Sequence, residues 1–363
     1  MIAPLDDNPR VSATQIDAVG SNPADPTLHP SVDVVVPAYN EELHIEACID
    51  GILAQDYPAN RLRLLLVDAG STDRTLALAQ GRAAHDERIV VVSGHGRLTT
   101  PEALNVGLRE SDAEIFARVD AHGRPAPDYI SRAIEALGTG GVDVVGVGGQ
   151  PRFAGKSSFG RAFTLARGSR LGVGGSVYAA TGSREIVDTV PWGIYRREAL
   201  EAVGGFDPAM NHGEDEELNW RLKEAGMRVM LDARISFEYV PRSSLGGVFR
   251  QYRDYGRARV RVVAAHPGFL RIRHLAPAGL VVLASGLALA SLFSAAARVG
   301  LAALAGAYLV AIAVGAAMAT GRDDLRLAPE VAACFPALHL GYGAGTIAGL
   351  FDLLRGRARD GHS

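Results

Sequence analysis

The sequence predicts an α/β fold in which a doubly wound sheet is followed by apolar membrane segments. Short apolar runs alternate with segments of helical periodicity between residues 32 and 147, a pattern typical of a parallel sheet connected by helices. Two of these runs end in an acid, at Asp68 and Asp120, and open α/β sheets bind ligands outside the carboxyl ends of their strands. From Leu275 the chain becomes strongly apolar. We therefore expect a polar site with a metal ion at the sheet edge, and a membrane region after the sheet.

The elements of the first half follow from two periodicities. Val32–Val36 is an apolar β-branched run closed by Pro37, and Asn40 is a suitable N-cap for a helix reaching about Gln55. The later strands are expected at Leu62–Val67, Ile89–Val92, Glu114–Val119 and Val142–Val147, and the later helices at Thr75–Ala84, from Pro101, and at about Pro127–Leu137. The first loop lacks a Gly-x-Gly-x-x-Gly pattern, so NAD-type dinucleotide binding is not expected.

The second half is less regular. Residues 151–190 are rich in Gly and Ser, which indicates a mobile loop region beside the site. After it we expect a short strand, a helix, a glycine turn, a second helix and two final strands, at Gly193–Arg196, Arg197–Val203, Gly204–Pro208, Asp215–Ala225, Arg228–Leu231 and Ile235–Val240.

Composition favours a large folded chain in a reducing compartment. Of its 363 residues 48% are hydrophobic, and a net charge of −3 gives no overall reason to expect nucleic acid as a partner. Cys48 and Cys334 fall in segments of different kinds, so a disulfide is not expected. Residues 1–30 hold five prolines and lack the pattern of a signal peptide. We expect them to be a disordered tail before a domain that stays in the cytoplasm.

A basic segment precedes the apolar part of the chain. Residues 242–273 hold eight arginines and one acid, which marks the cytoplasmic side of a membrane and attracts anionic headgroups. Leu275–Ala297 and Val299–Ala319 are long enough to span a bilayer. Val331–Leu350 either spans too or is re-entrant or interfacial. A third span would place the arginines after 354 outside, against the positive-inside rule.

Each acidic position has a functional and a structural interpretation. Asp68 contacts a nucleobase or ribose, or it belongs to a turn that caps the next helix. Asp120 and His122 hold Mg²⁺ or Mn²⁺ against a diphosphate, or they are ordinary loop residues. Asp215, beside Glu214, is a general base with a pKa raised by neighbouring acids, or it stabilises a helix dipole.

Three further residues keep two interpretations each. Trp192 lines a sugar site or packs in the core. Gln251 and Arg257 lie in the arginine-rich segment, which is most simply a membrane-surface stripe. Both residues are also candidates to reach a diphosphate or a lipid phosphate.

Taken together, the motifs resemble family 2 glycosyltransferases, which have the GT-A fold. The resemblance runs from Val32 to about Tyr239 and rests on several segments in order: Val34–Glu42, Asp68–Asp73, Pro101–Asn105, Gly204–Asp207 and Gly213–Arg221. It implies a mixed sheet with a Rossmann-like nucleotide-binding half and an acceptor half. It also implies transfer of a sugar with inversion, in which Asp68 contacts the base, Asp120 the metal and diphosphate, and Asp215 deprotonates the acceptor.

On this basis we assign site residues and domains. Donor binding is assigned to Pro37, Ala38, Tyr39, Glu41, Asp68, Gly70, Arg97, Asn105, Arg118 and Asp120. Acceptor or sugar binding is assigned to Trp192, Gly193, Glu214, Asp215, Gln251 and Arg257, and metal binding to Asp120 and His122. The expected domains are the tail 1–30, a catalytic domain 31–240, a basic segment 241–274, a membrane region 275–354 and a basic tail 355–363.

Two positions depart from the family pattern. Ala69 stands where a second Asp is usual, and His122 stands where Asp-x-Asp would place its second acid. The Asp-Ala-His version is most similar to succinoglycan-type exopolysaccharide glycosyltransferases. The Gln-x-x-Arg-Trp signature of processive synthases is absent. This absence, together with only two or three apolar segments, indicates addition of one sugar and not polymerisation. We expect a UDP-sugar donor and a polyprenyl-diphosphate-linked acceptor, or a polysaccharide acceptor, at a bacterial inner membrane. The rival interpretations are a sugar nucleotidyltransferase and an inactive membrane scaffold.

Overall fold

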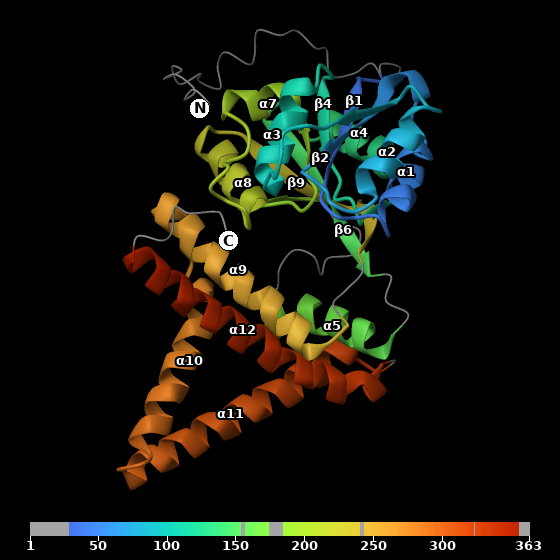
Figure 1. Cartoon of the computed structure of the whole chain (residues 1–363). Coiled ribbons are helices and arrows are strands. Elements are labelled where there is room, and N and C mark those ends of the chain that lie inside the picture. Colours follow the sequence, from blue (N-terminus) through green and yellow to red (C-terminus); the bar gives the residue numbers. More distant parts are fainter. Residues whose placement is uncertain (1–28, 154–156, 174–183, 240–242, 323, 356–363) are drawn as a thin grey trace. The chain divides into compact units, whose positions relative to one another are not determined.

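The computed structural model describes residues 29–153, 157–173, 184–239, 243–322 and 324–355 (Figure 1). They divide into two compact units. Unit 1 comprises Met1–Gly149, Arg184–Phe206 and Leu218–Ile235, and unit 2 comprises Gln150–Ser183, Asp207–Glu217 and Ser236–Ser363. The expected disordered tail lies almost wholly outside the described residues, and so does all but the first residue of the basic tail.

Unit 1 is built on a mixed nine-stranded sheet, counted over the described residues. Its order is β3-β2-β1-β4-β8-β6-β9-β5, with β7 paired to β9. The parallel part holds β1 against β2 and β4, and β2 against β3, whereas β8 runs antiparallel to both β4 and β6. The strands are β1 Val32–Ala38, β2 Leu62–Asp68, β3 Ile89–Val92, β4 Ile115–Arg118, β5 Arg124–Pro125, β6 Val144–Phe153, β7 Arg184–Val187, β8 Ile194–Arg196 and β9 Arg228–Tyr239.

Helices connect these strands much as the sequence predicts. They are α1 Ile45–Leu53, α2 Thr75–Ala83, α3 Thr100–Glu110, α4 Tyr129–Thr139, α7 Arg197–Ala202 and α8 Glu214–Glu224. In α3, Thr99 and Glu102 form a capping box, and Pro101 occupies the first turn. Gly107 lets α3 approach β1, because a Cβ there would lie 2.3 Å from Val35 Cγ1. Helix α3, which precedes β4, therefore packs directly on β1.

The mobile loop expected over 151–190 is wrong for much of its described part. Helices α5 (Ser158–Gly168) and α6 (Arg170–Val173) occupy it, while residues 154–156 and 174–183 lie outside the described residues. Ser157 caps α5 by accepting a hydrogen bond from Gly160 N at 3.1 Å. Phe163 and two alanines of α5 are buried in an apolar cluster of unit 2. Because several residues of α5 are small, its hydrophobic periodicity is too weak to predict a helix.

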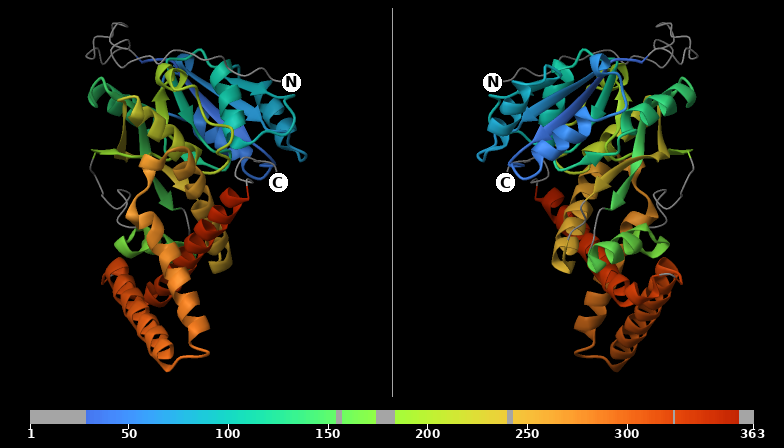
Figure 2. Two further views of the ribbon diagram at one scale, coloured as in Figure 1. Left: turned by 90° about the vertical axis from the view of Figure 1, so that its left-hand side faces the viewer. Right: turned by 90° about the vertical axis from the view of Figure 1, so that its right-hand side faces the viewer.

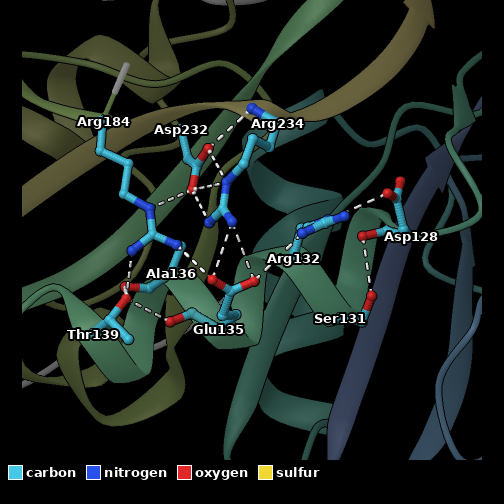
Figure 3. A network of polar contacts seen from close by, with 9 residues as sticks. All are labelled: Asp128, Ser131, Arg132, Glu135, Ala136, Thr139, Arg184, Asp232 and Arg234. Atoms are coloured by element: carbon cyan, nitrogen blue, oxygen red, sulfur yellow. Dashed lines mark hydrogen bonds and ion pairs between the residues drawn. The ribbon is translucent and has the colours of Figure 1, made fainter. Parts of the chain in front are cut away.

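The break expected between the two final strands is also wrong, because β9 is continuous from Arg228 to Tyr239. Asp232 interrupts its apolar pattern, but the carboxylate is buried and accepts hydrogen bonds from Arg184 at 2.7 Å and Arg234 at 2.8 Å (Figure 3). Both arginines also reach Glu135 of α4. This network of ion pairs joins β7, β9 and α4, and it offsets the desolvation cost of burying the Asp232 carboxylate.

Unit 2 contains the long helices α9 (Leu245–Ala265), α10 (Ile272–Ala290), α11 (Ala295–Thr320) and α12 (Ala328–Leu354). Three helical segments of the described chain are long and apolar enough to cross a membrane: Ile272–Ala290, Ala295–Thr320 and Leu325–Leu354. Figure 2 shows α10 and α11 as two long helices joined by a turn. This turn falls before Ser294, which caps α11, and not at Arg298, the residue between the two expected spans. Arg298 lies in the first turns of α11 and donates to Ser291 O at 3.0 Å.

Helices α9 and α12 lie side by side with their backbones in close contact. A Cβ on Gly345 would come within 1.9 Å of Arg253 O, one on Gly341 within 2.6 Å of Phe249 O, and one on Gly256 within 2.1 Å of Tyr342 O. Beyond the glycines, Arg257 Nε pairs with Asp352 at 2.5 Å. The third apolar segment is therefore attached along much of its length to the arginine-rich helix.

Candidate active site

The two acidic strand ends lie at one edge of the sheet, as predicted. Ala38 of β1 is in register with Asp68 of β2, and Val35 of β1 is in register with Arg118 of β4. Because these strands are parallel, their carboxyl ends share an edge. Asp68 and Asp120 therefore lie on the two sides of the end of β1.

Asp68 is buried, and its side chain stabilises the turn that follows β2. Its carboxylate accepts hydrogen bonds from the backbone N–H groups of Gly70, at 3.2 Å, and Ser71, at 3.3 Å. Gly70 has a φ of +84°, and a Cβ on it would lie 2.7 Å from Gly96 O. The turn therefore requires glycine, and it brings the loop that contains Gly96 and Arg97 to Asp68. The turn at Asp68 is confirmed, but α2 begins after Arg74 with no side-chain cap hydrogen bond. The contact of Asp68 with a nucleobase remains a prediction.

The loop of Arg97 places a flat, exposed pair of side chains at this edge. The guanidinium carbon of Arg97 lies 3.3 Å from the centroid of the Tyr39 ring, and Arg97 Nη1 donates to Leu98 O at 3.1 Å. Both side chains are exposed. A guanidinium stacked on an aromatic ring offers a planar surface and a positive charge together.

The loop after β1 and the turn after β2 are tied together by their polar side chains. Asn40, with a φ of +55°, accepts a hydrogen bond from Thr72 N at 2.8 Å, and its own N–H donates to Ser71 Oγ at 3.1 Å. Glu41 N donates to Thr75 Oγ1 at 2.7 Å. The prediction that Asn40 caps the first helix is wrong, because α1 begins after His44 and Asn40 bonds the turn after β2 instead. The two loops thereby hold each other in a fixed shape.

Asp120 is oriented by two donors. Its Oδ1 accepts from Arg118 Nε at 3.1 Å, and its Oδ2 accepts from Trp192 Nε1 at 2.9 Å. Burial works against its ionisation and is the largest effect on its pKa, but Arg118, His122 and the Trp192 hydrogen bond together outweigh it. They hold the pKa of Asp120 below its usual value. The Asp120 carboxylate is therefore ionised and held in one orientation.

Trp192 is buried and has a left-handed backbone conformation, with a φ of +46°. Its carbonyl accepts a hydrogen bond from the Tyr129 hydroxyl at 2.7 Å, and Gly123 leaves space for its ring. Its observed role is to orient Asp120, and the predicted contact with a sugar remains a prediction. Gly193 follows it as the connection into β8, and Gly193 O accepts from Arg118 N at 3.1 Å.

His122 pairs with Glu41 at 3.1 Å, and its side chain is 45% exposed. Within the described ranges no group of three or more His, Cys, Asp and Glu residues is arranged to hold a metal ion. Asp120 and His122 nevertheless supply one carboxylate and one imidazole at the same edge. This donor set suits a divalent cation that takes its remaining ligands from a diphosphate and water.

Asn105 has its amide group occupied within the fold. Its side chain accepts a hydrogen bond from Phe206 N at 2.8 Å and donates to Phe206 O at 2.6 Å. This pair of bonds holds the glycine turn at Gly204–Gly205 against α3. The assigned role in donor binding remains a prediction.

The acidic cluster forms the first turn of α8 and belongs to unit 2. Glu216 contacts Arg259 at 2.5 Å, and Glu217 contacts His266 at 2.9 Å. Glu214 and Asp215 also make polar or electrostatic contacts. On α9, Gln251 donates to the Tyr255 hydroxyl at 3.0 Å, and Arg257 is held by Asp352. The catalytic and acceptor roles of these residues remain predictions.

Residues 33–204 match the family model described as Glycosyl transferase family 2. The succinoglycan biosynthesis protein ExoA of Rhizobium meliloti (strain 1021) is 33% identical over 325 residues, which is 89% of this chain and 96% of that relative. The chain belongs to glycosyltransferase family 2. The predicted family and enzyme class of this glycosyltransferase are therefore confirmed. A second family model, Glycosyl transferase family 21, matches residues 189–340.

Two more distant similarities extend over most of this glycosyltransferase. A dolichyl N-acetyl-alpha-D-glucosaminyl phosphate 3-beta-D-2,3-diacetamido-2,3-dideoxy-beta-D-glucuronosyltransferase of Methanococcus voltae is 25% identical over 256 residues, 69% of this chain and 78% of that relative. The mannosyltransferase PcManGT from Pyrobaculum calidifontis, solved with GDP-Man and Mn²⁺, has a TM-score of 0.64 at 24% identity, with 94% of this chain and 93% of that chain covered. The predicted GT-A fold is thereby confirmed.

Proposed function

We propose that this glycosyltransferase moves one sugar, with inversion, from a UDP-sugar to a polyprenyl-diphosphate-linked acceptor in exopolysaccharide or cell-envelope glycan synthesis. The observation that carries the proposal is the pair of acids, Asp68 and Asp120, on either side of the end of β1. The acceptor class is supported by two relatives, one a succinoglycan biosynthesis protein and the other a transferase named for a dolichyl-phosphate-linked sugar. Nucleotide release with the lipid acceptor present, and a product of opposite anomeric configuration, test it.

The donor is held by the residues of the sheet edge. Asp68 receives the N–H of the uracil ring or a ribose hydroxyl, and the Tyr39–Arg97 pair offers a surface on which the base stacks. Pro37 and Ala38 at the end of β1, Glu41 in the loop after it and Gly70 in the turn after β2 are proposed to surround the bound nucleotide. Arg118 acts on the donor through Asp120, which it keeps ionised.

The acceptor is activated by Asp215. Inversion requires a single attack on the anomeric carbon, so one base and one means of stabilising the departing diphosphate are sufficient. Asp215 takes the proton of the attacking hydroxyl as the bond from the anomeric carbon to the diphosphate breaks. Glu214, Trp192, Gly193, Gln251 and Arg257 are proposed to bind the acceptor or the transferred sugar.

Asp120 and His122 are proposed to hold Mn²⁺ or Mg²⁺. A divalent cation there would neutralise the diphosphate charge and help the nucleotide to leave. Removing the metal with a chelator is expected to weaken UDP binding by at least about tenfold, because the diphosphate then meets the uncompensated charge of Asp120. Isothermal titration with UDP, with Mn²⁺ and with chelator, measures this difference.

A matched pair of histidines controls that experiment. His122→Ala is expected to reduce the Mn²⁺-dependent gain in UDP affinity. His44→Ala should not, although His44 lies 3.6 Å from the same Glu41. UDP affinity that does not depend on metal in the unsubstituted protein would contradict the assignment.

The membrane topology is proposed to be a two-helix hairpin, α10 and α11, with α12 lying at the cytoplasmic membrane surface. In the most apolar stretches of α10 and α11, 11% of each is buried within the protein. In the third segment, Leu325–Leu354, which contains α12, the buried share is 50%. Helix α12 is attached to α9, and each arginine of α9 would cost about 2.5–3.5 kcal/mol at the centre of a bilayer. With two spans, both ends of the membrane region remain in the cytoplasm of a bacterial inner membrane, in agreement with the positive-inside rule.

Cysteine labelling tests this topology. After both native cysteines, which are buried, are replaced by alanine, single cysteines are introduced at Leu43, Phe293 and Leu354, which are all exposed. In intact cells an impermeant maleimide is expected to label Phe293→Cys only. Leu43→Cys and Leu354→Cys should react only after the membrane is opened. Labelling of Leu354→Cys in intact cells would show that α12 spans.

A further inference from the structure

The first turn of α8 is joined to α9 by two acid–base pairs. Glu216 Oε1 contacts Arg259 Nη2 at 2.5 Å, and Glu217 Oε1 contacts His266 Nε2 at 2.9 Å. Arg259 lies in α9, and His266, seven positions later, is the residue that follows the last turn of α9. The two acids directly follow Asp215 in the chain.

Burial separates these pairs from an ordinary acidic helix start. Acids at the first turn of a helix favour the helix dipole when they are exposed, and they need no partner for that. The Glu217 side chain is only 2% exposed, and a buried carboxylate costs several kcal/mol unless it is paired. The dipole therefore does not account for Glu217, and its contact with His266 does.

Further packing surrounds these pairs. Arg259 also lies over the ring of Phe269, just after α9, with its guanidinium carbon 4.9 Å from the centroid. Gly213, just before α8, has a φ of +88°, and a Cβ there would lie 3.4 Å from Val262 Cγ2. The segment that carries Asp215 is thus held from both sides against one face of α9.

We propose that Glu217 and His266, together with Glu216 and Arg259, are positioning residues that fix Asp215 to the membrane-associated helix α9. The inference rests on the proposed role of Asp215 as the base. A base must lie within hydrogen-bond reach of the hydroxyl proton, and a displacement of about 1 Å costs about 100-fold in rate. The clamp, defined as these four residues, keeps the base at a constant position relative to the helix that faces a lipid-linked acceptor.

The test separates positioning from binding. His266→Ala is expected to lower kcat by about 10- to 100-fold, while UDP affinity and the KM for donor remain within twofold. His266→Gln retains an N–H near the position of Nε2 and is expected to recover most of the lost kcat. His85→Ala is the control, since His85 is exposed and its Nδ1 contacts the backbone oxygen of Gly81 at 2.8 Å, in its own helical region.

A reciprocal exchange tests the second pair independently. Glu216→Arg and Arg259→Glu are each expected to lower kcat strongly, and the double exchange should recover at least part of that loss, because the ion pair is restored with its charges reversed. Unchanged kcat in His266→Ala, or a double exchange no better than the worse single variant, would overturn the proposal. Asp215→Asn is measured alongside: if it stays active, the proposed base is wrong, and if it is inactive while the clamp variants are normal, only the clamp is wrong.

Discussion

Asp215→Asn is expected to lower kcat by about 10²–10⁴-fold and to leave UDP affinity within twofold of the unsubstituted value. Asparagine has nearly the same shape as aspartate but does not accept the acceptor proton. The nucleotide is assigned to Asp68 and Asp120 at the sheet edge, so its binding does not involve the lost carboxylate. Steady-state kinetics and titration with UDP measure the two quantities.

Glu224→Gln provides the control for this variant. Glu224 is the last residue of the same helix and is exposed, so the same chemical change is made away from the first turn. Its kcat should match that of the unsubstituted enzyme. Turnover of Asp215→Asn within tenfold of normal would contradict the base assignment and would direct attention to Glu214.

Asp120→Asn is expected to remove most metal-dependent UDP affinity and to lower kcat/KM by at least about 100-fold. The substitution keeps an oxygen that accepts from Trp192 Nε1 but removes the charge that Arg118 and the metal require. The Arg118 side chain is 6% exposed, so loss of its partner also destabilises the fold, by about 1–3 kcal/mol. Thermal unfolding is therefore measured together with UDP titration.

Asp112→Asn is the comparison for the second variant. Asp112 is also an aspartate paired with an arginine, Arg63, but its side chain is 88% exposed and it precedes β4, at the opposite end of that strand from Asp120. It should bind UDP normally in Mn²⁺. If Asp120→Asn is folded and retains full metal-dependent UDP affinity, the donor-site assignment fails.

The parallel half of the sheet could be predicted because its signals are local. Each strand is a continuous apolar run, and α3 begins with a capping box and Pro101. Two acids at the carboxyl ends of parallel strands must lie at the same edge of the sheet. The sequence alone therefore places Asp68 and Asp120 near each other. The segments that failed are those whose burial depends on distant partners.

Two wrong predictions and one unpredicted contact show this dependence. Asp232 looks like the end of a strand until Arg184, 48 positions away, pairs with it. The contact of the Trp192 indole with an acid 72 positions earlier was not predicted, and the predicted sugar contact of Trp192 remains a prediction. Helix α5 was not predicted, because its own residues show no strong hydrophobic periodicity. It is stabilised by packing into the apolar cluster of unit 2. None of these partners leaves a trace in the spacing of neighbouring residues.

The same reason explains why the acidic cluster was ambiguous. Four acids at a helix start fit a dipole as well as a catalytic base. The buried contact of Glu217 with His266, 49 positions later, shows that this turn is also bonded to a distant part of the chain, which the local sequence does not predict.

The most direct test of the central claim is nucleotide release from a panel of UDP-, GDP- and dTDP-sugars, with the detergent-solubilised protein, Mn²⁺ or Mg²⁺, and native membrane lipid. The account predicts release from one donor, a UDP-sugar, that depends on metal and lipid and disappears in both Asp120→Asn and Asp215→Asn. No release from any donor with lipid acceptor present, together with undetectable nucleotide binding, would contradict it and would favour a membrane scaffold that has lost activity.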